Sequence, residues 1–116
     1  MKKITSLLLP LICLAFIFSC NNKRSGTPKV LVFAKTAGFH HESISKGIPA
    51  IEKLGKENGF DVDTTTDAAM FNDDTLKKYS AIVFLHTTGP LFNTDERVAL
   101  ERYIQAGGGY MGIHAA

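Results

Sequence analysis

Two short runs of consecutive apolar residues constrain the fold more than any other feature of the sequence. One spans Lys29–Ala34 and the other spans Ala81–Leu85. A strand that is covered by helices on both faces is apolar along its whole length, whereas a half-exposed strand alternates apolar and polar residues. The two runs therefore predict central strands of a parallel sheet.

A helix is expected after the first of these runs. Either Ser43 or Ser45 can cap its start, and glycines end it near residues 55–59. With Ser45 as the cap, Pro49 lies in the first turn, where backbone N–H groups have no partner inside the helix. A start at Ser43 predicts a kink instead. The apolar positions at helical spacing are Ile44, Ile48, Ile51 and Leu54.

The segment between the two apolar runs also contains a second strand and a second, shorter helix. Residues 60–65 alternate apolar and polar side chains, which is typical of an edge strand with one solvated face. Asn72 is a plausible cap for a helix over 73–79, because aspartates in its first turn suit the positive end of the helix dipole.

The last part of the chain predicts a third helix and a fourth strand. Asn93 or Thr94 caps the helix, and Gly107 ends it in a left-handed conformation. The strand covers Tyr110–His114, and Gly112 inside it marks a close approach by another backbone or a ligand. The alternating order predicts an α/β fold, a flavodoxin-like three-layer sandwich with a mostly parallel sheet, truncated after the fourth strand.

All four histidines of the chain follow the ends of predicted strands. His40 and His41 follow the first strand, His86 follows the third, and His114 ends the fourth. The carboxyl ends of parallel strands meet at one edge of the sheet, where such sheets bind ligands. Neighbouring side chains in an extended segment point in opposite directions, so we expect His40 and His114 to face one cleft and His41 to turn away.

Histidines that converge on a cleft have three common uses. They act as metal ligands, as a general acid and base, or as hydrogen-bonding partners of a hydroxyl-rich ligand. The alternative is that these are loop residues exposed at one rim. The sequence has no HExxH pair and no GxGxxG motif after the first strand, so neither a zinc-protease helix nor a dinucleotide site is indicated.

The first twenty residues have the pattern of a lipoprotein leader. Lys2 and Lys3 precede an apolar run that is too short to span a membrane, and Ser19-Cys20 follows it. The junction resembles a bacterial lipobox, in which the cysteine is lipidated and becomes the new N-terminus; plain secretory cleavage nearby is the alternative. The predicted parts are a signal peptide over 1–19, lipidated Cys20 with a polar tether over 20–28, and a domain over 29–116.

The mature chain would be a neutral, cysteine-free protein anchored in the cell envelope. Cys13 lies inside the leader, so no disulfide or thiolate ligand is expected between residues 21 and 116. Losing Lys2 and Lys3 lowers Lys+Arg from 13 to 11, against 11 Asp+Glu, and the formal net charge falls from +2 to zero. This balance argues against a nucleic-acid partner.

Three segments resemble a known bacterial family. VLVFAKTAGFHHESI, AIVFLHTTG and ERYIQAGGGYMGIHAA look like the ThuA-like (trehalose-utilisation) family over residues 29–116, and the fold of that family is similar to class I glutamine amidotransferases. Such domains run on for roughly another hundred residues. The resemblance therefore implies an N-terminal part, which is expected to be incomplete as a stable unit.

The resemblance also implies site residues. His114 stands where the amidotransferases present a cysteine nucleophile, so glutaminase activity is not implied. His114 and His40 would be the catalytic residues, and the substrate-binding residues would be Lys35, Gly38, Phe39, His86, Thr87 and Gly112.

The expected ligand is a carbohydrate such as trehalose or a related glycoside. If the protein is an enzyme, His114 transfers protons to or from a sugar hydroxyl or a derived carbonyl, helped by His40 and by a divalent metal if one is bound. The alternative is a glycan-binding or partner-docking lipoprotein without turnover. In both cases the membrane is reached through the lipid anchor.

Overall fold

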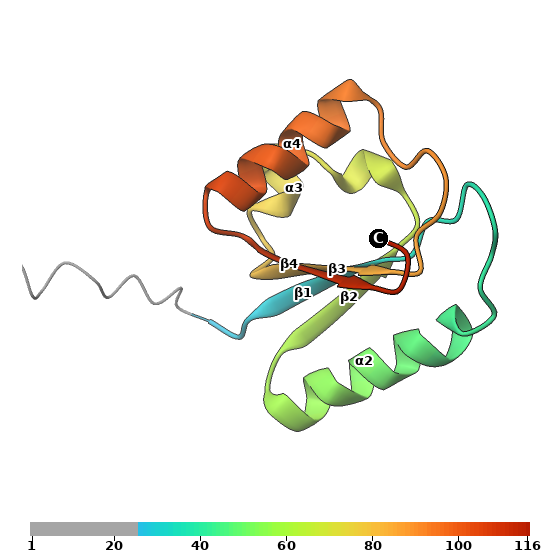
Figure 1. The fold of residues 1–116 in the computed structure, drawn as a ribbon. Coiled ribbons are helices and arrows are strands. Elements are labelled where there is room, and N and C mark those ends of the chain that lie inside the picture. Colours follow the sequence, from blue (N-terminus) through green and yellow to red (C-terminus); the bar gives the residue numbers. More distant parts are fainter. Residues whose placement is uncertain (1–25) are drawn as a thin grey trace, which may run out of the picture.

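The computed structural model describes residues 26–116, which form one open parallel sheet with helices on both faces (Figure 1). The signal peptide over 1–19, the lipidation site Cys20 and most of the tether over 20–28 lie outside the described residues. Within the described residues, no helix combines the length and apolar character needed to cross a membrane. The elements in chain order are β1 (Lys29–Phe33), α2 (Ile44–Asn58), β2 (Asp61–Thr65), the 3-10 helix η2 (Ala68–Met70), α3 (Asp73–Leu76), β3 (Ala81–Leu85), α4 (Thr94–Gln105) and β4 (Gly109–Ile113).

The strands lie in the order β2-β1-β3-β4, and all three neighbouring pairs are parallel. The sequence-based prediction of an edge strand over 60–65 is confirmed by β2, and that of a central strand over Lys29–Ala34 is confirmed by β1. Val30 is aligned with Val62 on one side and with Ala81 on the other. This register brings the carboxyl ends of all four strands to the same edge.

The helices divide between the two faces of the sheet, which confirms the three-layer sandwich. Figure 1 shows α2 covering one face and α3 and α4 covering the other. On the α2 side, the core is built from small and branched residues such as Val32 and Leu85. On the other side, it is built mainly from aromatic rings: Phe33 is fully buried and packs against Phe71, Phe84 and Phe92. Alternate side chains of each buried strand thus supply two separate cores.

Helix α2 begins at the first of its two predicted caps. The Ser43 carbonyl accepts hydrogen bonds from the backbone N–H groups of Lys46 and Gly47, at 3.0 and 2.8 Å, and so starts the helix ahead of Ser45. Pro49 therefore lies inside the helix rather than in its first turn. The Ser43 side chain makes no capping bond and is free to contact a different part of the fold.

The other two helices follow the capping signals of the sequence. Asn93 and Glu96 form a reciprocal capping box at the start of α4, and Gly107, with a φ of 90°, follows its last turn. Asn72 caps α3, but this helix ends at Leu76 and not at Tyr79 as predicted. Tyr79 is buried, and its hydroxyl donates a 2.7 Å hydrogen bond to Asp63 in β2.

Candidate functional site

Three imidazole rings meet at the carboxyl edge of the sheet. The rings of His41 and His114 have centroids 4.8 Å apart, those of His41 and His86 are 5.2 Å apart, and those of His86 and His114 are 5.3 Å apart. One nitrogen from each ring can be chosen so that all three lie within 4.8 Å of one another. These residues, called the histidine cluster below, come from the loops that follow β1, β3 and β4.

The ends of β3 and β4 position two members of the cluster. His86 and His114 each follow the last residue of a strand, and the His86 N–H donates to the Ile113 carbonyl at 3.1 Å, which continues the β3–β4 ladder by one bond. Both histidines have a left-handed backbone, with φ values of 51° and 61°. This conformation is uncommon for a residue with a side chain and disfavours it by about 1–2 kcal/mol. It turns the chain sharply at each strand end and gathers the two rings.

His41, and not His40, joins them, so the prediction for this pair was wrong. The His41 carbonyl accepts a 3.1 Å hydrogen bond from the N–H of Ile44, so the chain is already turning into α2. Alternation of neighbouring side chains holds for extended backbone and does not apply here. His40 is exposed, and its Nδ1 shares a 3.2 Å hydrogen bond with the hydroxyl of Thr36.

The loops that follow β1 and β3 are joined by several hydrogen bonds. Thr36 and Thr88 form an isolated parallel bridge beyond the ends of the two strands. The Thr88 carbonyl accepts from the N–H groups of Ala37 and Gly38, at 2.8 and 3.2 Å, and its hydroxyl donates to the Phe39 carbonyl at 2.7 Å. Figure 1 shows both loops at the same end of the sheet. The bonds fix the loop that carries His41 against the loop that carries His86.

The surroundings of His41 favour the uncharged form of its ring. Burial, followed by the neighbouring imidazoles of His114, His86 and His40, lowers the pKa of His41 from its usual value of 6.5. A neutral imidazole donates from one nitrogen and accepts at the other. The cluster can therefore offer both a donor and an acceptor to a ligand.

His86 is held by a contact that the sequence-based interpretation missed. Its Nε2 lies 3.3 Å from the Ser43 hydroxyl, whereas its Nδ1 is buried without a hydrogen-bond partner in the described part of the chain. Ser43 was considered only as a helix cap. No signal in the sequence pairs it with a residue 43 positions away.

Two of the other predicted site residues use their polar groups inside the protein. The Lys35 amine donates to the Leu91 carbonyl at 2.8 Å, and the buried Thr87 hydroxyl donates to the Ala115 carbonyl at 3.5 Å. These bonds connect the loops around the cluster to one another. Lys35 and Thr87 therefore each have a hydrogen-bond partner in the backbone of a neighbouring loop.

The remaining predicted residues have different environments. A Cβ on Gly112 would lie 2.7 Å from the Cβ of Ala116, so the close approach comes from the protein's own chain. Gly38 lies against the loop after β3. Phe39 is 71% exposed, and its ring contacts His41 edge-on at a centroid distance of 4.9 Å. Phe39 thus directly borders the cluster.

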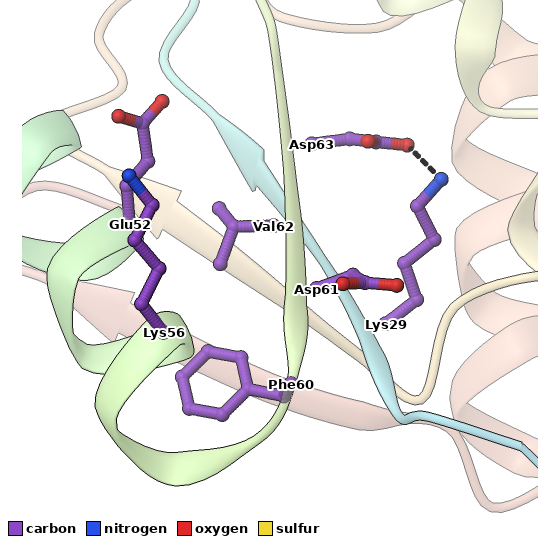
Figure 2. A pocket seen from close by; sticks show the side chains of 7 residues that line it. All are labelled: Lys29, Glu52, Lys56, Phe60, Asp61, Val62 and Asp63. Atoms are coloured by element: carbon purple, nitrogen blue, oxygen red, sulfur yellow. Dashed lines mark ion pairs between the residues drawn. The ribbon is translucent and has the colours of Figure 1, made fainter.

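A hollow of about 380 Å³ lies at the opposite end of the sheet, along β2. Its lining residues come from β1, α2 and the β2 segment, and they lie on both sides of β2 (Figure 2). Ligand sites of open parallel sheets lie outside the carboxyl ends of the strands, whereas this hollow borders the amino ends of β1 and β2. Figure 2 shows Lys29, Asp61 and Asp63 on one side of β2 and Glu52, Lys56, Phe60 and Val62 on the other.

Two of the charged residues beside this hollow already pair with each other within the fold. Lys29 and Asp63 form a 2.7 Å ion pair, drawn in Figure 2, and the hydrogen bond from Lys29 is the main reason that the pKa of Asp63 is lowered. Burial and the bond to Asp63 raise the pKa of Tyr79 to about 12. The three groups join β1 and β2 to the segment after α3, which is a structural role. The histidine cluster is therefore the candidate functional site.

Comparisons with known proteins agree with the fold and with the motifs. The model of the ThuA family, described as trehalose utilisation, matches residues 29–116. A solved structure of a ThuA-like protein from Bacteroides uniformis is similar, with 28% sequence identity and a TM-score of 0.66. The match covers 85% of this chain and 40% of the solved chain, so this chain spans about two fifths of that relative's length. A comparison with curated proteins gave no match.

Proposed function

The chain belongs to the ThuA family of trehalose utilisation, and we propose from this premise that it acts in carbohydrate utilisation through its histidine cluster. The observation that carries the proposal is the meeting of His41, His86 and His114 at the carboxyl edge of a parallel sheet. That edge is where open α/β sheets bind ligands. The expected ligand is trehalose or a related glycoside.

The cluster suits a ligand rich in hydroxyl groups. His114 is the exposed member of the cluster, whereas His41 and His86 are half-buried. In the enzymatic version, His114 exchanges a proton with a sugar hydroxyl or a derived carbonyl, and His41 takes the assisting role that was predicted for His40. His40 remains a contact at the rim.

A second candidate function is carbohydrate binding without turnover. It is favoured by Phe39, whose exposed ring stands beside His41 at the border of the cluster. An aromatic ring next to polar groups offers an apolar surface to one face of a sugar and hydrogen bonds to its edge. Both versions predict the same binding site and differ only in whether the sugar is altered.

Trehalose is expected to bind the full chain and to shift the NMR signals of the histidine rings in the cluster. The His114→Asn variant should bind trehalose up to about tenfold more weakly, because a neutral hydrogen bond contributes about 0.5–1.5 kcal/mol. Asparagine is chosen because it tolerates the left-handed backbone of His114. Glycerol, a small polyol without a sugar ring, is the control ligand and should leave the signals unchanged at the same concentration.

The same NMR samples distinguish the two versions when they are followed over time. New sugar signals that depend on His114 would favour the enzyme, whereas saturable binding with unaltered trehalose would favour the binding protein. If a panel of trehalose, sucrose, maltose and glucose gives neither ring shifts nor turnover, the carbohydrate proposal is rejected.

We also propose that lipidated Cys20 anchors the protein in the cell envelope. This rests on the charged, apolar leader and on the Ser19-Cys20 junction. Cys20→Ala should move the protein from the membrane fraction to a soluble or unprocessed form. Alanine has no thiol that can be lipidated, so the variant lacks the acyl chains on which stable anchoring depends. Cys13→Ala, which changes the other cysteine of the leader, is the matched control and should remain processed and membrane-bound. Unchanged partition and processing of Cys20→Ala would disprove the anchor.

A further inference from the structure

We propose that His41, His86 and His114 bind one divalent transition-metal ion of the zinc class. The three residues come from three different loops, and one nitrogen from each lies within 4.8 Å of the other two. The proposal deepens the proposed function, because it states what the cluster would hold beside a sugar. The metal and the sugar would share one site. Metal binding is measured with no sugar present, so the two proposals can be tested separately.

The spacing of the rings fits a metal site after a small closure. Zinc–imidazole bonds are about 2.0–2.1 Å long, which places two nitrogens on one tetrahedral zinc about 3.3 Å apart. The nitrogens of the cluster lie within 4.8 Å, so the rings must approach by about 1.5 Å at most. In the proposed site, rotation of the imidazoles about their side-chain bonds would supply this approach.

The donor set selects the kind of metal. All three ligands are imidazole nitrogens, which suit zinc, copper, nickel and cobalt. Calcium and magnesium prefer six or more oxygen ligands, and the cluster supplies no carboxylate. Three protein ligands also leave a fourth position, which is the arrangement of catalytic rather than structural zinc sites. A sugar hydroxyl or carbonyl oxygen could occupy that position.

His86 has the hydrogen-bonding pattern of a metal-bound histidine. Such a residue usually donates from one ring nitrogen to a nearby group, which fixes the ring while the other nitrogen binds the metal. In His86, Nε2 bonds with the Ser43 hydroxyl, and buried Nδ1 has no partner within residues 26–116. A metal ion would satisfy this buried nitrogen. Ser43 would then be a positioning residue.

The backbone at the cluster supports the same conclusion. His86 and His114 both have positive φ values, a conformation that is disfavoured for ordinary residues and is concentrated at functional sites. The two strained turns serve to aim the two rings at each other and at His41.

The first test uses the full chain without an affinity tag, after treatment with a chelator and dialysis. Calorimetry should show one equivalent of Zn²⁺ bound, and Co²⁺ should give the visible absorption bands of a four- or five-coordinate ion. In NMR spectra, zinc should shift the ring signals of His41, His86 and His114 much more than those of His40. This measurement needs no variant, so it tests zinc binding by the histidine cluster even if a substitution prevents folding.

The second test compares variants that keep the local backbone. His86→Asn and His114→Asn each remove one proposed ligand, and asparagine tolerates the positive φ at these two positions. His41→Ala removes the third ligand. Each should weaken zinc binding by at least about a hundredfold, since even the loss of an outer hydrogen-bond partner costs about 10–100-fold. His40→Ala removes the adjacent, exposed histidine and is the matched control, with an expected change within about twofold of the natural chain.

Ser43→Ala tests the positioning role. It should weaken zinc binding by about 10–100-fold, and circular dichroism should show unchanged helix content, because the Ser43 side chain makes no capping bond. Ser43→Thr, which keeps a hydroxyl, should restore most of the affinity. Equal affinity of Ser43→Ala and the natural chain would remove Ser43 from the site.

Some outcomes would overturn the metal proposal itself. They are the absence of stoichiometric zinc or cobalt binding, ring shifts centred on His40, or an equal loss of affinity in His40→Ala and His114→Asn. Zinc binding without any effect of sugars would leave the metal site intact and reject the carbohydrate function. Sugar binding to a chain that binds no zinc would support the carbohydrate function and reject the metal site.

Discussion

Replacing Phe33 with alanine is expected to lower the free energy of unfolding by about 3–5 kcal/mol. The Phe33 ring is fully buried and lies 4.6 Å from the ring of Phe71 and 5.4 Å from those of Phe84 and Phe92, measured between centroids. Its removal leaves a cavity at the centre of the aromatic core and takes away three ring contacts. Chemical denaturation followed by circular dichroism measures the change.

Phe39→Ala is the matched control, because it makes the same chemical change on the surface. Phe39 is 71% exposed, so the free energy of unfolding should change by no more than about 0.5 kcal/mol. Since small domains are stable by only about 5–15 kcal/mol, Phe33→Ala has a good part of the native stability to lose. Equal effects of the two substitutions would show that the aromatic core is not where the fold gains its stability.

Gly89→Ala is expected to have the second-largest effect, and it should disturb the histidine cluster as well as the fold. Gly89 has a φ of 76°, and a Cβ there would lie 2.8 Å from the backbone nitrogen of Gly38. The loops after β1 and β3 would have to separate. The expected loss is about 1–2 kcal/mol for the left-handed backbone and about 1–3 kcal/mol more for the clash.

Gly59→Ala separates the two contributions. Gly59 has nearly the same φ, 73°, but a Cβ there meets nothing within 4 Å. This variant should lose only the conformational part, about 1–2 kcal/mol, and should keep the ring signals of the cluster in place. Denaturation curves of the two variants, together with their histidine NMR spectra, provide the comparison. If both variants lose the same stability and keep the same spectra, the contact between Gly38 and Gly89 is not important for holding the loops.

The sheet could be predicted from the sequence because its signals are local. The continuous apolar runs mark β1 and β3 as buried strands, and alternation marks β2 as an edge strand. The capping residues Asn72 and Asn93 placed the starts of α3 and α4 correctly. Where prediction failed, at the end of α3, a tertiary contact decided the outcome: Tyr79 packs into the core and bonds to Asp63 instead of continuing a helical turn.

The candidate site could be predicted only in part. The positions of His86 and His114 could be predicted because each follows the end of a strand. Parallel neighbouring strands end at the same edge of the sheet, so the two histidines meet there. The choice between His40 and His41 depended on where the chain turns into α2, and this turn begins with the bond between the His41 carbonyl and the N–H of Ile44. The roles of Ser43 and Lys35 depended on partners 43 and 56 residues away, which no local pattern reveals.

The hydrogen bonds around Thr88 have a consequence for the thermodynamics of binding. A flexible loop loses conformational entropy when a ligand orders it, at a cost of about 1–2 kcal/mol for each backbone residue that becomes fixed. Here the bridge from Thr36 to Thr88, and the bonds from Thr88 to Ala37, Gly38 and Phe39, are made entirely within the chain. The cost of ordering these loops is met during folding. A ligand that reaches the three imidazoles therefore meets a preorganised surface, and more of its contact energy remains as affinity.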